Sequence, residues 1–314
     1  MYITLENAIS KIINEEIVAL PTETVYGLAA RFDSEVAIRK VFSAKNRPLD
    51  QPLILHVSSV SMAKQYLKNW SEVHDVLSSE FWPGPLTLLD EKSKLVSNII
   101  TAGSSKVAVR MPNHSIFLSI INGVQVPLVA PSANPHKRTS PTTAAHVEQL
   151  FNGQVQVVEG GPAQVGLEST ILEILRLVPL TLKIARPGNI TREQIDNVIK
   201  SKLYINATWS EQKSVTAPGQ LLEHYRPEYP LVCTNELDHH SIVSFQKSND
   251  CKIITLGGDA KKISQELYAT LHDCKLADPS KSVIIYLPDL CISDETWISV
   301  IDRLTRASKF VVFL

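Results

Sequence analysis

Hydrophobic and polar residues recur with helix and strand periods along the first 200 residues. Residues 7–14 place their apolar side chains on one face at spacings of three and four, which predicts a helix. Residues 53–57 form an apolar run interrupted only by His56, which is typical of a strand buried on both faces. The same reasoning predicts helices over 34–43, 61–67, 71–81 and 141–150, the last capped by Ser140, and strands over 17–20, 86–89, 107–110, 128–130, 155–158 and 169–174. This mixture predicts an α/β domain over residues 1–205.

The stretch from 206 to 230 breaks the pattern. It has no sustained periodicity and contains three prolines. A linker that simply spans a gap is more often small and polar, whereas this one carries His224, Tyr225 and Arg226, which can stack on a ligand or bond to it. We therefore interpret residues 206–230 as a linker that lies over an active site.

Residues 231–314 alternate again between short apolar runs and amphipathic segments. Strands are predicted over 231–234, 252–257, 282–287 and 309–314, with helices over 260–274 and 295–307. Alternating strands and helices favour a parallel sheet. The sequence therefore predicts a second, smaller, Rossmann-like α/β domain over residues 231–314.

Composition narrows the class of protein. Hydrophobic residues make up 44% of the 314 and charged residues 20%, as in ordinary globular proteins. The formal net charge of −1 lacks the basic excess of proteins that grip nucleic acid through many phosphates. No apolar run approaches the roughly 18 residues of a membrane span, and the acidic N-terminus does not resemble a signal peptide. The four widely spaced cysteines argue against a disulfide framework, so we expect a cytoplasmic protein.

A polar cluster, PTETVYGLAA, covers residues 21–30 and follows the predicted strand at 17–20. Open α/β sheets usually bind ligands where their strands end, which makes Thr24 and Tyr26 candidate binding residues. The alternative is a capped turn in which Thr22 or Thr24 bonds the backbone and Gly27 relieves a tight bend.

The segment KNRPLDQPLILHV, residues 45–57, places two cations before a buried strand. Lys45 and Arg47 suit a polyphosphate, because Arg binds phosphate in a fork and Lys acts as a point charge. A solvated basic turn is the alternative. His56 stands where an apolar residue would serve a core better, although a buried neutral histidine with satisfied bonds would also fit.

The loop APSANPHKRTSPTTAAHV, residues 130–147, carries Ser132, Asn134 and Ser140 and ends at a predicted helix N-terminus. A rigid hydroxyl-rich loop of this kind is a reasonable anion site, and a capped loop is the alternative. Three further short motifs end strands or follow them: VAVR with Arg110, GLEST at 166–170 and ARPGN at 185–189.

Several catalytic motifs are absent from the sequence. There is no G-x-x-x-x-G-K-[ST], no G-x-G-x-x-G, no G-x-S-x-G and no H-E-x-x-H. The histidines lack metal-ligand spacing, and the cysteines lie outside the motif-rich region. These absences argue against a cysteine nucleophile in that region and against a tightly held zinc.

Taken in order, PTETVYGL, KNRPLDQPLILHV, FWPGPLTLL, VAVRMPNH, APSAN with SPTTAAHV, GLEST and ARPGNI span about residues 5–198. This series resembles the threonylcarbamoyl-AMP synthase (YrdC) family, in its longer two-domain form. The resemblance implies a twisted, mixed, open sheet with helices in the first domain. It also implies a nucleotidyltransferase that makes threonylcarbamoyl-AMP and pyrophosphate from L-threonine, bicarbonate or CO2 and ATP, with Mg²⁺ arriving on the ATP.

The resemblance implies positioning by cations and hydroxyls, with no catalytic nucleophile and no protein metal site, and it implies site residues motif by motif. The threonine-binding residues are Thr24, Tyr26, His56, Arg110, Ala130 and Thr170. The ATP-binding residues are Lys45, Arg47, Gln51, Lys106, Ser132, Asn134, Ser140, Arg186 and Tyr225. Gln51 and Lys106 depart from the residues common in the family, and Gln220, Leu221, Leu222 and Glu223 replace a basic cluster before His224.

By the same resemblance, the product passes to a transferase complex that modifies adenosine in tRNA. Direct binding of tRNA by this chain is expected to be weak or indirect. Two alternatives remain open at this stage. One is a related carbamoyltransferase domain, and the other is an RNA-binding accessory protein.

Overall fold

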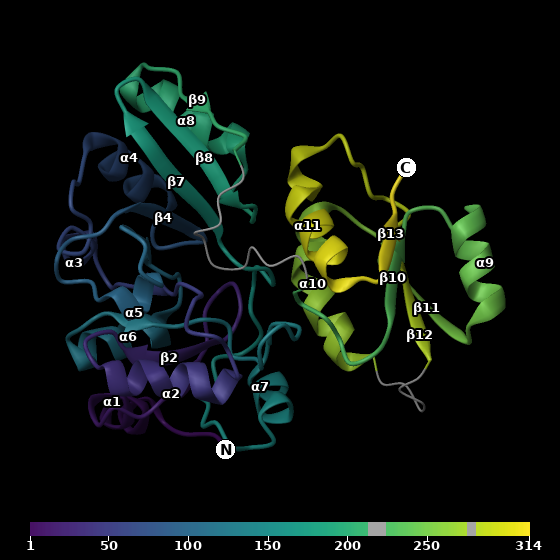
Figure 1. The fold of residues 1–314 in the computed structure, drawn as a ribbon, viewed down its shortest axis with the longest axis horizontal. Coiled ribbons are helices and arrows are strands. Elements are labelled where there is room, and N and C mark those ends of the chain that lie inside the picture. The colour runs from purple at the N-terminus through teal and green to yellow at the C-terminus, as the bar shows by residue number, and fades with distance from the viewer. Residues whose placement is uncertain (213–223, 275–280) are drawn as a thin grey trace.

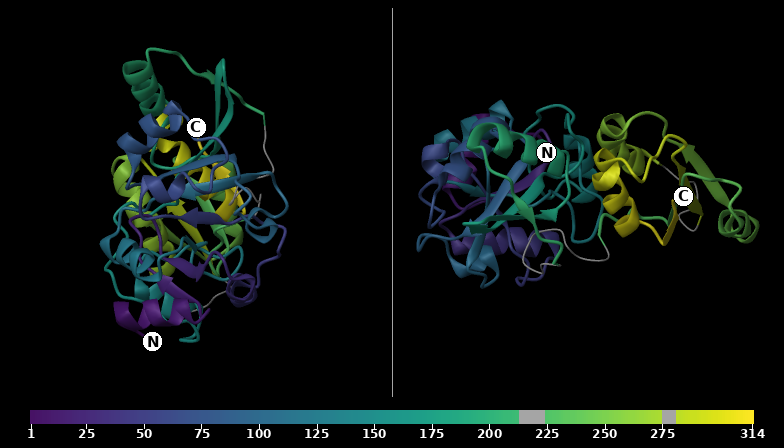
Figure 2. Two further views of the ribbon diagram at one scale, coloured as in Figure 1. Left: turned by 90° about the vertical axis from the view of Figure 1, so that its left-hand side faces the viewer. Right: turned by 90° about the horizontal axis from the view of Figure 1, so that it is seen from above.

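The structure, a computed structural model, describes residues 1–212, 224–274 and 281–314. Among these residues the strands form two sheets, one of nine strands and one of four, in two domains that lie side by side (Figures 1 and 2). The first domain contains α1 (Leu5–Ile13), β1 (Val18–Leu20), β2 (Gly27–Arg31), α2 (Glu35–Lys45), β3 (Ile54–His56), α3 (Val60–Ala63), α4 (Glu72–Phe81), β4 (Leu86–Glu91), α5 (Asn98–Thr101), β5 (Lys106–Arg110), α6 (Ser115–Val124), β6 (Leu128–Val129), α7 (Ala144–Leu150), β7 (Thr170–Leu177), β8 (Leu180–Arg186), α8 (Arg192–Leu203) and β9 (Thr208–Trp209). The second contains β10 (Leu231–Thr234), α9 (His240–Ser248), β11 (Cys251–Thr255), α10 (Ala260–Asp273), β12 (Ser282–Tyr286), the 3-10 helix η1 (Glu295–Trp297), α11 (Ile298–Ala307) and β13 (Phe310–Val312).

Side-chain caps fix where many of the helices begin. Short polar residues accept a hydrogen bond from a backbone N–H of the first turn, which would otherwise lack a partner. The capping residues of this kind are Thr4, Ser34, Ser59, Thr143, Thr191 and Asp259. The longest described helix, α10, has 14 residues. Within the described ranges, no helix is both long enough and apolar enough to cross a bilayer.

The large sheet is mixed, with the strand order β1-β2-β6-β3-β5-β4-β7-β8-β9. β3 pairs with β5 in parallel, and β4 pairs with β7 in parallel, while most other neighbours are antiparallel. In the parallel pair, His56 lies beside Arg110 in register. The predicted mixed open sheet is thus confirmed, and its register brings two candidate site residues together.

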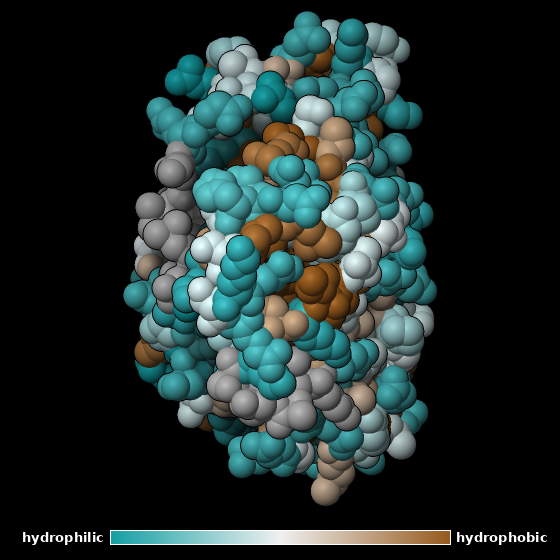
Figure 3. Space-filling model, turned by 90° about the vertical axis from the view of Figure 1, so that its right-hand side faces the viewer, coloured by the Kyte–Doolittle hydropathy of each residue, from teal (hydrophilic) through white to brown (hydrophobic). Residues whose placement is uncertain are grey.

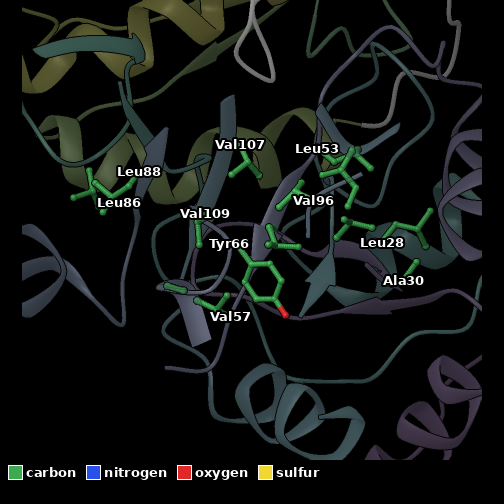
Figure 4. Close-up of a cluster of buried hydrophobic side chains, with 14 of the residues drawn as sticks. Leu28, Ala30, Leu53, Val57, Tyr66, Leu86, Leu88, Val96, Val107 and Val109 are labelled. Atoms are coloured by element: carbon green, nitrogen blue, oxygen red, sulfur yellow. The ribbon is translucent and has the colours of Figure 1, made fainter. Parts of the chain in front are cut away.

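Both faces of this sheet are buried. Along β2, Leu28 and Ala30 join one apolar cluster while Ala29 joins another, as the alternation of a strand requires. Helices α2, α4, α7 and α8 contribute to the first cluster, and α1 and α6 to the second. Figure 4 shows part of the first cluster, where side chains of β2, β4 and β5 lie together with Tyr66 and Val96 from loops.

The small sheet is entirely parallel, with the order β11-β12-β10-β13. Helices α10 and α11 lie on the side that faces the first domain, and α9 lies on the far side (Figure 1). The outer face of this domain is mostly hydrophilic, with hydrophobic side chains gathered near its centre (Figure 3). The predicted parallel α/β domain is confirmed, and two of its helices are placed to contact the first domain.

Four local predictions differ from the structure. A linker was expected over 206–230, but Thr208–Trp209 form β9, the edge strand of the large sheet, parallel to β8. The helix expected over 141–150 begins at Ala144, with Thr143 rather than Ser140 as its cap. The helix expected over 61–67 is the single turn α3. The strand expected over 155–158 forms only isolated parallel bridges, from Val157 to Tyr2 and to Ala19.

Candidate active site

A cavity lies where the sheet of the first domain meets the linker. Its walls come from strand ends and the loops that follow them, which is where open α/β sheets bind ligands. The lining residues are Thr24, Val25, Arg47, Pro52, Leu53, Ile54, His56, Arg110, Ala130, Pro131, Ser132, Glu168, Arg186, His224 and Tyr225. Eight of the predicted site residues are among them: Thr24, Arg47, His56, Arg110, Ala130, Ser132, Arg186 and Tyr225.

Arg110 and His56 form one part of this wall. The Arg110 guanidinium is buried, pairs with the Glu23 carboxylate at 2.7 Å and donates to the Gly84 carbonyl at 3.2 Å. Burial, together with the nearby charge of Arg110, lowers the pKa of His56 to about 3. Its imidazole is therefore neutral at physiological pH, and its Nδ1 atom is buried with no hydrogen-bond partner among the described residues.

Three cations form another part of the site: Lys45, Arg47 and Arg186. Lys45 closes α2 and is buried, donating to the backbone carbonyls of Ser132 and Asn134. Burial, reinforced by Arg47, lowers the pKa of Lys45 well below its ordinary value. Burial lowers the pKa of Arg47 to about 10, so its guanidinium stays charged at neutral pH. Arg47 and Arg186 line the cavity, and their charges suit an anion. Lys45 is not one of the lining residues, and neither are Asn134 and Ser140.

The hydroxyl-rich loop is held by its own hydrogen bonds. The Asn134 amide donates to the carbonyls of Pro135 and Arg138, both at 2.8 Å, so this side chain shapes the loop. The Ser140 hydroxyl donates to Glu168 at 2.6 Å. Because that bond uses the only proton of the hydroxyl, Ser140 can accept a hydrogen bond from a ligand but cannot donate one.

The linker enters the cavity through Tyr225, whose ring is almost completely buried. Its backbone is left-handed, with φ at 62°, and the His224 ring stacks on its own ring with centroids 4.0 Å apart. Thr139 donates to the Tyr225 carbonyl at 2.9 Å. His224 and Tyr225 are therefore packed into the site, whereas Thr208 and Trp209, at the start of the predicted linker, form β9 at the edge of the large sheet. Residues 220–223 lie outside the described ranges.

Other predicted site residues do not line the cavity. Tyr26 is buried and bonds the backbone at Gly160 and Gly161. Thr170 exchanges hydrogen bonds with the backbone of Ile190. Both side chains therefore support the walls. Gln51 contacts His136 at 3.4 Å, beside the site.

Lys106 lies apart from the cavity. Its ammonium pairs with Glu173 at 2.8 Å. It begins β5, whereas Arg110 ends the same strand, and five strand residues span about 13 Å. The predicted contact of Lys106 with ATP is not supported by this placement, because its charge already has a buried partner.

Two carboxylates of the site, Glu23 and Glu168, were not assigned from the sequence, and His224 was named only as a linker side chain able to contact a ligand. Each stands inside or beside a motif that the sequence analysis singled out, PTETVYGL, GLEST or the linker. A carboxylate within a cluster of cationic motifs was the signal that could have identified Glu23 and Glu168. Their roles as partners of arginines required the tertiary structure.

The family profile described as "Telomere recombination", for Sua5, YciO and YrdC proteins, matches residues 10–188. The chain belongs to the Sua5/YciO/YrdC family. A second profile, described as the C-terminal domain of threonylcarbamoyl-AMP synthase, matches residues 190–309. The family predicted from the ordered motifs is therefore confirmed, in its two-domain form.

Individual relatives support the assignment of this chain to the Sua5/YciO/YrdC family. A threonylcarbamoyl-AMP synthase of Pyrococcus abyssi is 40% identical over 69% of this chain and 64% of its own length, just under two thirds. One of Schizosaccharomyces pombe is 32% identical over 98% of this chain and 88% of its own. The crystal structure of P. abyssi Sua5 complexed with L-threonine superposes with a TM-score of 0.86 at 30% identity, covering 99% of this chain and 96% of that one.

The described residues contain no group of three or more His, Cys, Asp or Glu side chains arranged to hold a metal ion. The site instead offers arginine and lysine cations, hydroxyls and backbone groups. Such a set suits a ligand that carries carboxylate and phosphate groups.

Proposed function

We propose that this chain is an L-threonylcarbamoyladenylate synthase, which forms threonylcarbamoyl-AMP and pyrophosphate from L-threonine, bicarbonate or CO2 and ATP. One observation carries the proposal. A single cavity joins Arg110 and the neutral His56 with Arg47 and Arg186. An amino-acid carboxylate suits the first pair, and a polyphosphate suits the second. The names of the relatives support the same reaction.

The reaction needs no protein nucleophile. The threonine amine attacks CO2 and loses a proton to give an N-carboxylate. A carboxylate oxygen then bonds to the α-phosphorus of ATP while the bond to pyrophosphate breaks. Holding the reactants in line can supply roughly 7–11 kcal/mol of the barrier, and cations stabilise the charge that develops on the phosphates. Mg²⁺ would arrive with the nucleotide and offset part of the negative charge of its phosphates.

Within this proposal, Arg110 holds the threonine carboxylate, and Thr24, His56 and the Ala130 backbone surround the amino acid. Arg47 and Arg186 hold phosphates, with Lys45 behind them and Ser132 beside the nucleotide. The unliganded cavity measures about 60 Å³, compared with roughly 300–1,000 Å³ for typical small-molecule sites. His224 and Tyr225 therefore have to withdraw before a nucleotide can enter.

The product would be the donor for threonylcarbamoyladenosine in tRNA and would pass to a separate transferase complex. The net charge of −1 gives no reason to expect firm tRNA binding by this chain. We propose that tRNA is the destination of the group that is made here and not a ligand of this site.

The test is to incubate the purified chain with threonine, bicarbonate and Mg-ATP and to measure pyrophosphate together with the mass of the adduct. Each substrate is omitted in turn. Arg47→Ala and Arg110→Ala should each reduce turnover by about 100-fold or more, as removal of a charged transition-state or substrate contact does. Arg39→Ala, which removes an exposed arginine from α2, is the matched control.

Absence of pyrophosphate above background in the wild-type protein would overturn the proposal. Tight RNA binding with a steep salt dependence would then favour a binding module. Wild-type turnover in both Arg47→Ala and Arg110→Ala would refute the assignment of the site.

A further inference from the structure

Arg303 is a fully buried arginine of the second domain that contacts Glu168 in the wall of the candidate site. It lies on α11, and its Nε donates to the Glu168 carboxylate at 2.9 Å. Its Nη2 donates to the Pro187 carbonyl at 3.0 Å, and its guanidinium lies 5.1 Å from the centre of the Tyr225 ring. One side chain thus contacts the GLEST loop, the ARPGN loop and the linker.

Backbone packing shows that this contact is built into both domains. Gly166, just before Glu168, has a φ of 80°, and a Cβ there would collide with the backbone oxygen of Ser264 on α10. The ring hydroxyl of Tyr268, also on α10, donates to Glu168 at 3.1 Å. The GLEST loop therefore approaches the second domain more closely than a residue with a side chain would allow.

Glu168 is the acceptor at the centre of these contacts. It receives hydrogen bonds from Ser140 of the first domain and from Tyr268 and Arg303 of the second. Burial acts to raise the pKa of Glu168, but the charges of Arg303 and Arg186 outweigh it and lower the pKa to about 2. Glu168 is therefore an ionised carboxylate in the wall of a cavity that we propose binds a polyphosphate.

A carboxylate in such a wall has two unfavourable effects unless it is neutralised. It repels the phosphates, and it competes with them for nearby cations. Arg186 is the cation at risk, since it is buried, lines the same cavity and lies within the field of Glu168. Its hydrogen bonds go instead to Ser169, at 2.9 to 3.1 Å, while Arg303 takes the ion pair with Glu168.

We propose that Arg303 is a positioning residue of the nucleotide site: it neutralises Glu168, so that Arg186 stays available to the phosphates. This inference builds on the proposed function and gives the second domain a task in it. Arg303 itself does not touch the substrate. Asp302, which pairs with Arg303 at 2.6 Å and with Arg306 at 2.8 Å, holds the guanidinium in place.

The test compares Arg303→Met, Arg303→Lys and the double variant Glu168→Gln/Arg303→Met. Arg303→Met should raise the KM for ATP by about tenfold or more while the KM for threonine stays within about twofold, because an unbalanced buried charge acts on the nearby anion. Arg303→Lys keeps the charge and should retain most of the affinity. The double variant removes both charges and should return the KM for ATP to within about threefold of wild type.

Lys261→Met is the matched control, since it removes an exposed positive charge from α10 of the same domain and should keep the wild-type KM. Binding of α,β-methylene-ATP, measured by calorimetry, gives a second readout that does not require turnover. A wild-type KM for ATP in Arg303→Met would overturn the inference. So would a double variant as impaired as Arg303→Met, because a purely structural arginine would not be rescued by removing its counter-charge.

If Arg303→Met does not fold, the comparison rests on the double variant and Arg303→Lys. A folded double variant with a KM for ATP raised tenfold would then overturn the inference. The two proposals fail separately. If the wild-type protein makes no pyrophosphate, and Arg303→Met binds the ATP analogue more weakly than wild type does, the proposed reaction is refuted but the role of Arg303 is not. An active wild type with unchanged analogue binding in Arg303→Met refutes the role of Arg303 alone.

Discussion

The guanidinium of Arg110 lies 2.7 Å from the carboxylate of Glu23, and each side chain is only 4% exposed. In this state the arginine that we assign to the threonine carboxylate is already paired with a carboxylate of the protein. A threonine carboxylate therefore has to share or displace Glu23. A buried arginine that lacks a partner is costly, so Glu23 keeps the empty pocket stable while holding Arg110 for the ligand.

Glu23→Gln should lower the stability of the free protein by about 3 kcal/mol, because it leaves Arg110 without a buried counter-charge. Threonine should then raise the melting temperature of the variant by more than it raises that of wild type, since the ligand carboxylate replaces the missing charge. Thermal unfolding with and without threonine measures both effects. Asp33→Asn, which breaks the more exposed pair with Arg31, is the control. Equal threonine shifts in Glu23→Gln and wild type would contradict the prediction.

His56→Leu should weaken the preference of the site for threonine over valine. The neutral imidazole carries a buried Nδ1 without a described partner, so it can bond the threonine hydroxyl, which valine lacks. A site that bonds a substrate hydroxyl rejects the analogue without it, and the loss of one such bond should reduce discrimination by about tenfold to 100-fold. The ratio of kcat/KM for the two amino acids measures it. An unchanged ratio would place the hydroxyl elsewhere.

Glu168 should make the protein sensitive to acid. Its pKa is lowered from an ordinary 4.5 to about 2 in the folded chain. The resulting stability is fully present above the unfolded-state pKa and is lost as the pH falls through the folded-state value. A difference of this size corresponds to roughly 3 kcal/mol. The free energy of unfolding, measured with denaturant between about pH 6 and pH 2, should fall more steeply for wild type than for Glu168→Gln. Parallel pH profiles would contradict this.

Glu295 should contribute to holding the domains together. Its carboxylate, on η1 of the second domain, accepts hydrogen bonds from the backbone N–H groups of Arg192 and Glu193 at the start of α8, at 2.9 and 3.3 Å. Capping bonds of this kind contribute about 1 kcal/mol. Glu295→Ala should lose that stability in denaturant unfolding, and Glu295→Gln, which keeps one acceptor oxygen, should lose less. Equal stability of both variants and wild type would contradict the prediction.

Amphipathic periodicity predicted the elements whose apolar face is narrow and regular. α4 and α10 lie close to their predicted ranges. α8 was not assigned, because it buries few side chains, Ile195 and Ile199 among them, and carries a weak apolar stripe. Its capping box at Thr191 and Gln194 was a usable signal. Residues 155–158 have the alternation of apolar and polar side chains that is typical of a strand. Their backbone hydrogen bonds are divided between the N-terminal residues and β1, so no continuous ladder forms.

Site residues could be predicted where one motif contained the residue and also indicated which way its side chain points. Arg110 and Arg186 end β5 and β8, and both side chains line the cavity as expected. Lys106 does not line the cavity, and the sequence gives no sign of its partner Glu173 across the sheet. The role of Arg303 could not be predicted, because Arg303 and Glu168, which form an ion pair, are 135 positions apart in the chain.

The pairing of Glu168 with Arg303 has a consequence for how this chain can change over generations. A buried carboxylate at position 168 is destabilising unless the arginine of the second domain pairs with it, so Glu168 and Arg303 should be inherited together. A lineage that lost its second domain would be expected to replace Glu168 with an uncharged residue first. A glutamate at position 168 of the first domain would therefore indicate that the chain also has the second domain.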